Sequence, residues 1–227
     1  MAWSRIPRSY AFGVAATVVL IAVAALFAVI DWWAVWKREP TVERIAKPAA
    51  MAMLVGVAAV AGDASGDIRM WLVVGALFGL VGDVALLGEG ETAFMAGLGA
   101  FALGHLAYVV AALLVGFDVV WSVPGVIFMM ALLGYRFAAH TVPGARREGG
   151  PVLAGAVVFY AVVISAMVVT SWATAVWLAA AGAMLFAISD WVLGYQRFVR
   201  PLPGRGLSVI VPYHLGQALL IIGLATS

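Results

Sequence analysis

The sequence has 227 residues, of which 65% are hydrophobic and only 11% are charged, and it contains no cysteine. A soluble domain would carry about a quarter charged residues, so most of this chain must lie in lipid. The basic residues are scattered between apolar runs and form no basic face, which excludes a nucleic-acid-binding domain. The lack of cysteine excludes disulfide bonds, cysteine-ligated metals and a thiol nucleophile.

Apolar runs bounded by charges, Gly or Pro predict the membrane-spanning helices. Met1 to Tyr10 carries Arg5 and Arg8, but the apolar run after it is too long for a signal peptide, so we expect it to be retained with the first span. The second span, 48–62, is short and is expected to begin earlier, near Arg44. We expect an all-α integral membrane protein, a bundle of eight transmembrane helices that forms a single polytopic domain over residues 1–227. The expected spans are 10–36, 48–62, 70–88, 94–116, 122–140, 152–170, 172–196 and 206–226.

The basic residues are distributed unevenly between the two sides of this predicted bundle. Ten of the 13 Lys and Arg residues fall in the odd-numbered loops, and three fall on the other side. The positive-inside rule therefore places the odd loops in the cytoplasm and both termini outside. Arg outnumbers Lys by 11 to 2 and Ala is abundant, which is typical of a GC-rich bacterial genome. We expect a multi-pass protein of a bacterial inner (plasma) membrane.

Two acidic residues, Asp83 and Asp190, lie inside predicted spans. An ionisable group near the centre of a membrane costs about 3 kcal/mol or more, so a functional role is favoured over a purely structural one. Small residues share a helix face with each acid, as Gly79 does with Asp83 and Gly182 with Asp190. Small residues mark places where helices approach closely, so both acids are expected to face the bundle interior. Asp31 ends the first span beside two tryptophans, where an interfacial anchor is expected.

The remaining polar side chains of the spans gather toward the predicted cytoplasmic half. We expect spans three, four, seven and eight to enclose one polar pocket that opens to the cytoplasmic leaflet, with the two acids close together. A weak internal repeat supports their pairing, because Gly82-Asp83-x-x-Leu and Ser189-Asp190-x-x-Leu are each followed by a His-Leu pair, at His105 and His214. A four-plus-four duplication would relate the acids by a pseudo-twofold axis along the membrane normal. The other polar residues are Lys47, Tyr108, Tyr213 and Gln217.

Short motifs in one order carry a family resemblance. They are Lys47-Pro48; Gly82-Asp83; Gly97 to Phe101 with His105 and Tyr108; Tyr160; Gly182-Ala183 to Phe186 with Ser189-Asp190; Arg197-Phe198; and Tyr213 with Gln217. In these features the sequence resembles the YhhN/TMEM86 family, the lysoplasmalogenases. The resemblance implies eight spans, and hydrolysis of the vinyl ether bond of lysoplasmalogens to a fatty aldehyde and a glycerophospho-alcohol. It also implies that Asp83 and Asp190 are the catalytic pair. The chain departs from the family at His214, where an aromatic residue is frequent, so the role of His214 is open.

The implied chemistry suits two carboxyl groups. One acid protonates the carbon end of the vinyl ether, and water captures the resulting oxocarbenium ion. An ionised partner stabilises the cation and activates water, as paired carboxylates do in glycoside hydrolysis. The sequence does not decide which aspartate takes which role.

The other site residues have two interpretations each. Lys47 could pair with the lipid phosphate or extend to the interface as a positive-inside residue. The remaining candidate residues could orient the two aspartates or the lipid head group, or only form hydrogen bonds between helices. These residues are His105, Tyr108, Tyr160, Tyr213 and Gln217. The expected partners are a lysophospholipid substrate and membrane lipid, without nucleic acid, metal or cofactor.

Two alternatives stay open. A metal-dependent intramembrane lipid hydrolase could use His105, His214 and the aspartates, although no HExxH motif is present and His140 lies at a span end. A proton-coupled carrier without enzymatic activity would also need buried acids and repeats. Against a carrier, Pro124 and Pro212 lie near span ends and leave the spans unbroken.

Overall fold

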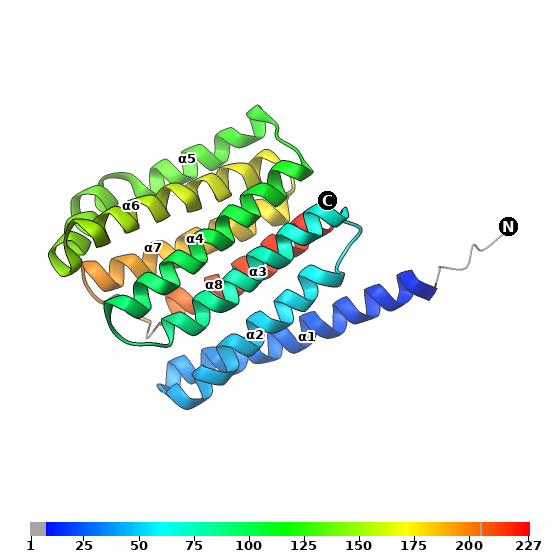
Figure 1. The fold of residues 1–227 in the computed structure, drawn as a ribbon, viewed down its shortest axis with the longest axis horizontal. Coiled ribbons are helices and arrows are strands. Elements are labelled where there is room, and N and C mark those ends of the chain that lie inside the picture. The colour runs from blue at the N-terminus through cyan, green and yellow to red at the C-terminus, as the bar shows by residue number, and fades with distance from the viewer. Residues whose placement is uncertain (1–7, 205) are drawn as a thin grey trace.

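The computed structural model describes residues 8–204 and 206–227, which contain helices and no strand. Figure 1 shows them in chain order. The helices are α1 (Arg8–Lys37), α2 (Pro40–Val60), α3 (Gly66–Leu86), α4 (Gly90–Val115), α5 (Val119–Arg136), α6 (Val142–Ala173), α7 (Trp177–Phe198) and α8 (Leu207–Ala225), with a π-helical turn at Phe137–Thr141. Met1 to Pro7, including Arg5 of the predicted N-terminal segment, and Arg205 of the last loop lie outside the described residues.

Within the described part of the chain, six helical segments are long and apolar enough to cross a membrane. Helices occupy all eight predicted ranges, but the predicted count of eight spans is not confirmed by length and composition. The first reason is that α2 begins earlier than predicted, at Pro40, and so includes the charged residues Glu43, Arg44 and Lys47. The second is that α5, the π-helical turn and α6 form one helical stretch, Val119–Ala173.

The ends of the helices follow local sequence signals. Pro40 occupies the first turn of α2, where its missing N–H is not needed. The Ser65 side chain accepts a hydrogen bond from the Ile68 amide at the start of α3. The Asp118 carboxylate accepts hydrogen bonds from two amides at the start of α5. These side chains satisfy amide groups that the first helical turn leaves free.

The long stretch from α5 to α6 bends at glycines. Gly134 has non-helical backbone torsions, as do Gly149 and Gly150. Gly150 has φ +70°, a conformation that favours glycine because a side chain there would be strained. Pro151 follows directly. Because these breaks turn the chain back on itself, α5 and the long part of α6 lie side by side (Figure 1).

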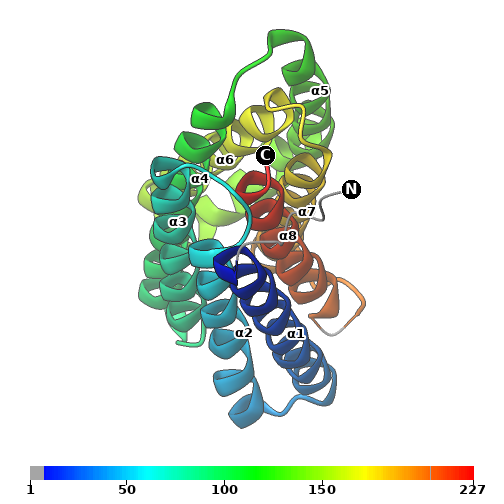
Figure 2. The ribbon, with the colours of Figure 1, turned by 90° about the vertical axis from the view of Figure 1, so that its right-hand side faces the viewer.

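The helices form an elongated bundle. Helices α3, α4, α7 and α8 lie at its centre, with α1 and α2 on one side and α5 and α6 on the other (Figure 2). The tightest pairs are α3 with α4 and α7 with α8. The two predicted intramembrane acids come from α3 and α7, one from each central pair.

Within each central pair, glycines let the backbones of the two helices come into contact, as the small-residue faces predicted. A Cβ atom added to Gly182 on α7 would lie 2.3 Å from the amide nitrogen of Leu220 on α8. A Cβ atom added to Gly216 on α8 would lie 2.7 Å from the amide nitrogen of Phe186. On the other pair, a Cβ atom added to Gly104 would lie 3.0 Å from the Gly75 carbonyl oxygen. Close backbone approach at these glycines therefore holds α7 against α8 and α3 against α4.

We expect Gly182→Ala to destabilise the protein, because backbone atoms of α8 occupy the space that its methyl group needs. Overpacking of this kind costs about 1 to 3 kcal/mol, which corresponds to a fall of roughly 5 °C in the melting temperature. Thermal unfolding of the purified protein in detergent measures it. Gly155→Ala on α6 is the matched control, since no atom lies within 4 Å of its added Cβ. Equal melting temperatures for the two variants would contradict this packing.

Candidate active site

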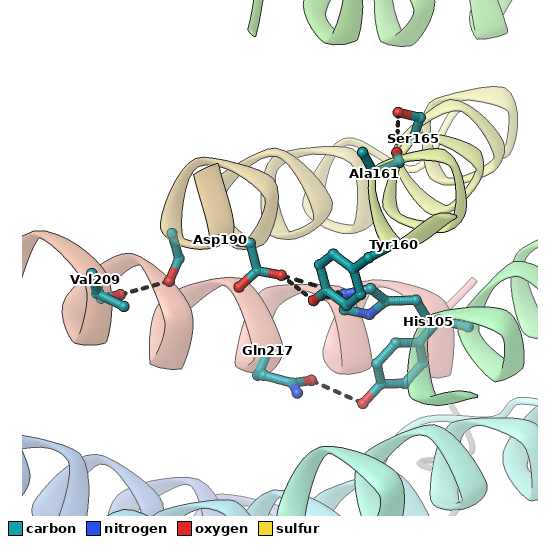
Figure 3. A network of polar contacts seen from close by, with 9 residues as sticks. His105, Tyr160, Ala161, Ser165, Asp190, Val209 and Gln217 are labelled. Carbon is teal, nitrogen blue, oxygen red and sulfur yellow. Dashed lines mark hydrogen bonds and ion pairs between the residues drawn. The ribbon is translucent and has the colours of Figure 1, made fainter. Parts of the chain in front are cut away.

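Asp190, in the second half of α7, lies in a polar cluster that three helices build (Figure 3). Tyr160 of α6 donates its hydroxyl hydrogen to Asp190 Oδ2. His105 Nε2 of α4 lies 2.9 Å from the Tyr160 hydroxyl and 3.5 Å from Asp190 Oδ2. His105 and Tyr160 are buried, whereas the Asp190 side chain keeps 15% of its surface exposed. These three residues are the Asp190 cluster.

Asp83, near the end of α3, has a different set of partners. Lys47 Nζ of α2 lies 3.4 Å from Asp83 Oδ1, and the Tyr213 hydroxyl of α8 donates to Asp83 Oδ2 at 2.7 Å. The Asp83 side chain is fully buried and the Lys47 side chain is 12% exposed. An ammonium group and a hydroxyl therefore compensate the buried carboxylate, as such a group requires in lipid. These three residues are the Asp83 cluster.

Two aromatic rings contact both clusters. The Phe101 ring of α4 lies 6.4 Å from the His105 ring and 5.8 Å from the Tyr213 ring, measured between centroids. The Phe186 ring of α7 lies 4.6 Å from the His105 ring and 5.3 Å from the Tyr213 ring. Three of these four contacts are edge-to-face and the Phe101–His105 contact is tilted, and such packing fixes the rings and the residues that they touch. The clusters therefore meet through Phe101 and Phe186.

Tyr108 and Gln217 form a further polar contact between α4 and α8. The Tyr108 hydroxyl donates to Gln217 Oε1 at 2.9 Å, and both side chains are buried. Gln217 lies one helical turn after Tyr213, so this contact continues from the Asp83 cluster along α8. Figure 3 shows the Gln217 contact beside the Asp190 cluster.

A narrow, mainly apolar cavity of about 70 Å³ reaches the Asp190 cluster. Its walls come mainly from α4, α5, α6 and α7, and Asp190 and Tyr160 line it together with apolar residues such as Phe101 and Leu132. This apolar cavity differs from the expected pocket, which α3, α4, α7 and α8 were to enclose with both acids. Asp83 does not line it, because Asp83 is fully buried against Lys47 and Tyr213.

A wider cavity of about 450 Å³ adjoins the first. Leu86, Phe94 and Leu193 line both cavities, so the two share a wall. The second cavity has four polar side chains, of Glu43, Lys47, Gln196 and Arg197, and we call it the polar cavity. The pair of cavities therefore places a charged compartment next to an apolar one, which suits an amphiphilic ligand.

Asp31 is not the interfacial anchor that the sequence predicted. Its side chain is fully buried, and its Oδ2 lies 4.0 Å from His214 Nε2 of α8. Trp32 Nε1 donates to His214 Nδ1 at 3.0 Å. Because an indole N–H only donates, the neutral His214 ring carries its hydrogen on Nε2, on the side of Asp31. The neighbouring tryptophans suggested an interface, but one of them instead orients a buried histidine.

The structure brings most of the predicted site residues together. Asp83, Asp190, Lys47, His105, Tyr160 and Tyr213 form the two clusters, and Tyr108 and Gln217 form the adjacent contact. Sequence reasoning gave no role to the Phe101 and Phe186 rings or to the partners of His214. The regular four-residue spacing of Gly182, Phe186 and Asp190 on α7 was a signal that could have identified Phe186.

The two histidines of the metal-dependent alternative have different partners. His105 contacts Asp190, whereas His214 lies near Asp31. Over residues 8–204 and 206–227, no three His, Asp or Glu side chains form a group that could hold a metal ion.

The sequence of the chain is similar to those of known proteins. The chain is 33% identical over 160 residues to lysoplasmalogenase TMEM86B of Mus musculus, an alignment that covers 70% of this chain and 66% of that protein. The chain thus spans slightly less than two thirds of the length of that relative. No solved structure matches the chain significantly. The model of the YhhN family matches residues 42–224, from α2 to α8, and the chain therefore belongs to the YhhN family.

Proposed function

We propose that the protein is an intramembrane hydrolase that cleaves the vinyl ether bond of lysoplasmalogens, giving a fatty aldehyde and a glycerophospho-alcohol. The observation that carries the proposal is the carboxyl group of Asp190, which lines an apolar cavity that adjoins a charged one. An amphiphile with its head group in the polar cavity would extend its chain past Asp190. Membership of the YhhN family, and similarity to a protein named lysoplasmalogenase, support the same reaction.

In this proposal Asp190 donates and regains the proton, and the ionised Asp83 stabilises the cation. Asp190 gives its proton to the carbon end of the vinyl ether, because it is the acid that lines the cavity. The positive charge then spreads over the carbon and the ether oxygen, beside the Phe101 ring, whose face favours a cation. Asp83 is the ionised member, which Lys47 and Tyr213 hold in place, and its negative charge stabilises the cation.

Water completes the reaction. It adds to the cationic carbon and gives up a proton to the carboxylate that Asp190 has become, which restores the acid. The hemiacetal then collapses to the aldehyde and leaves the original ether oxygen on the glycerol. His105 and Tyr160 orient Asp190 throughout, because Tyr160 donates to one carboxylate oxygen and leaves the other for proton transfer.

We further propose that the chain is a single domain that crosses a plasma membrane eight times. The α2 helix and the two limbs of the α5–α6 stretch would add the spans that composition does not identify. The odd loops, which carry most of the basic residues, would face the cytoplasm, with both termini outside. The polar cavity would then open toward the cytoplasmic leaflet, since Lys47 and Arg197 belong to these basic regions.

The contacts of the acids support the four-plus-four repeat as part of this proposal. A pseudo-twofold axis would exchange α2 with α6, α3 with α7 and α4 with α8. Asp83 of α3 contacts Lys47 of α2 and Tyr213 of α8, and Asp190 of α7 contacts Tyr160 of α6 and His105 of α4. The partners of each acid thus come from equivalent helices, although their chemistry differs.

The purified full-length protein in lipid nanodiscs tests the proposed reaction. We expect a 1-alkenyl lysophospholipid to give equal amounts of aldehyde and glycerophospho-alcohol by mass spectrometry. The 1-alkyl and 1-acyl lysophospholipids of the same chain and head group should give neither product. In D₂O the aldehyde should carry one deuterium on the carbon next to the carbonyl group, because the acid protonates that carbon.

Three other outcomes would contradict the proposal. Cleavage of the 1-acyl lipid would indicate an ester hydrolase instead. Loss of activity with a chelator, restored by a divalent metal ion, would favour the metal-dependent alternative. Proton-coupled uptake of the lipid into proteoliposomes without any product would favour the carrier.

A further inference from the structure

Arg197, in the last turn of α7, has no part in the proposed chemistry. Its Nη2 donates to Glu148 Oε1 at 2.7 Å, and its guanidinium carbon lies 3.9 Å from the centroid of the Phe94 ring. The ion pair and the ring stacking hold the planar group in one orientation. Its buried Nε atom has no hydrogen-bond partner among the residues that the structure describes. The side chain is thus fixed in place with unused donor capacity.

Among the residues that the structure describes, Arg197 and Lys47 are the two cations of the polar cavity, but their charges are not equally available. Lys47 is only 12% exposed and lies 3.4 Å from the fully buried Asp83, so its charge is compensated inside the bundle. Arg197 is 25% exposed, and its partner Glu148 is 38% exposed, so water weakens that ion pair. An anion that enters the cavity therefore meets Arg197 as the cation that can change partners.

The position of Arg197 relative to Asp190 fits the proposed substrate. Seven residues on one helix correspond to two turns, so the two side chains share a face and are about 10 Å apart along the axis. This distance is of the order of a glycerol backbone plus a hydrogen bond at each end. A lysophospholipid with its vinyl ether at Asp190 would thus place its phosphate at Arg197.

We propose that Arg197 binds the phosphodiester group of the single-chain phospholipid whose head group occupies the polar cavity. The fork of guanidinium N–H donors matches two phosphate oxygens, which a lysine cannot match. Lys47 instead serves as the charge partner of Asp83. This inference rests on the proposed function for the identity of the lipid, but not for the binding of phosphate.

Binding measurements with ligands that cannot be cleaved test this proposal separately from the reaction. The probes are a 1-alkyl lysophospholipid and the 1-alkylglycerol of the same chain, which lacks the phosphate. We expect Arg197→Gln to weaken binding of the phospholipid by about 10- to 100-fold and to change binding of the alkylglycerol by less than about 2-fold. Arg197→Lys, which keeps the charge and loses the fork, should fall between the wild type and Arg197→Gln.

Arg200→Gln is the matched control, because it removes the same charge from an exposed position three residues away. It should leave both affinities unchanged. Equal weakening of both ligands by Arg197→Gln would show a structural role only, and equal effects of the two Gln variants would show a general charge effect. Either result would overturn the proposal. Displacement of the phospholipid by inorganic phosphate as strongly as by glycerophosphocholine would also overturn it, since the site would then take free phosphate.

Kinetics give a second measurement with an alkenyl lysophospholipid. A phosphate contact is made equally in the ground and transition states, so Arg197→Gln should raise KM by about 10-fold or more and leave kcat nearly unchanged. A fall in kcat with KM unchanged would overturn the assignment to binding. If no vinyl ether is cleaved at all, the proposed function is wrong. The role of Arg197 in phosphate binding is then still tested by the binding measurements, which need no cleavage.

Discussion

Asp190→Asn is expected to lower the turnover of an alkenyl lysophospholipid by about 10² to 10⁴, because the amide cannot donate a proton to carbon. Asn keeps the size of the side chain and can still accept the hydrogen bond from Tyr160. The protein should therefore insert normally and keep its melting temperature within a few degrees. The measurement is the rate of aldehyde formation by mass spectrometry at saturating lipid.

Asp83→Asn is expected to lower turnover in the same range, but with a second effect. It leaves the Lys47 ammonium, 3.4 Å away, without a charge partner, so stability should fall as well. Asp63→Asn is the control for both variants, since Asp63 is an exposed loop residue and its loss should change neither rate nor stability. An Asn variant with near wild-type rates would remove that aspartate from the mechanism.

The ion pair of Lys47 with Asp83 should be costly to break from either side. Lys47→Met leaves a buried carboxylate uncompensated, and Asp83→Asn leaves a mostly buried ammonium uncompensated. Breaking a buried pair from one side costs about 3 to 5 kcal/mol, which lowers the melting temperature by roughly 10 °C in a protein of this size. The double variant removes both charges, so it should be more stable than the sum of the single losses predicts.

A double-mutant cycle of melting temperatures in detergent measures this coupling, expected to be about 0.5 to 3 kcal/mol. Lys37→Met with Asp83→Asn is the matched cycle, because Lys37 ends α1 in an exposed position and contacts the Trp36 ring. That second pair of substitutions should be additive. Additive losses for Lys47 and Asp83 would show that the two groups do not stabilise each other.

The sequence by itself determined the class of the protein and the identity of its unusual residues. Apolar runs and scarce charges establish a helical membrane protein, because each helix satisfies its own backbone groups and needs only a local pattern. The same local logic singled out Asp83 and Asp190, since an acid inside an apolar run is visible without any knowledge of its neighbours. The glycine spacing around them predicted that they face other helices, and the contacts of Asp83 and Asp190 with residues of neighbouring helices confirm it.

Only the tertiary structure decided which partner each acid has and which acid reaches a cavity. Asp83 contacts Tyr213, which lies 130 positions away in the chain, and Asp31 lies near His214, which is still farther away in the chain. Such pairings depend on how whole helices cross, and the residues on one face of a helix do not show which other helix will pack against it. For this reason Asp31 had the sequence surroundings of an interface but lies in the interior, and Asp190 rather than Asp83 lines the apolar cavity. Local pattern fixes which residues must be buried, whereas the packing of distant segments determines what they touch.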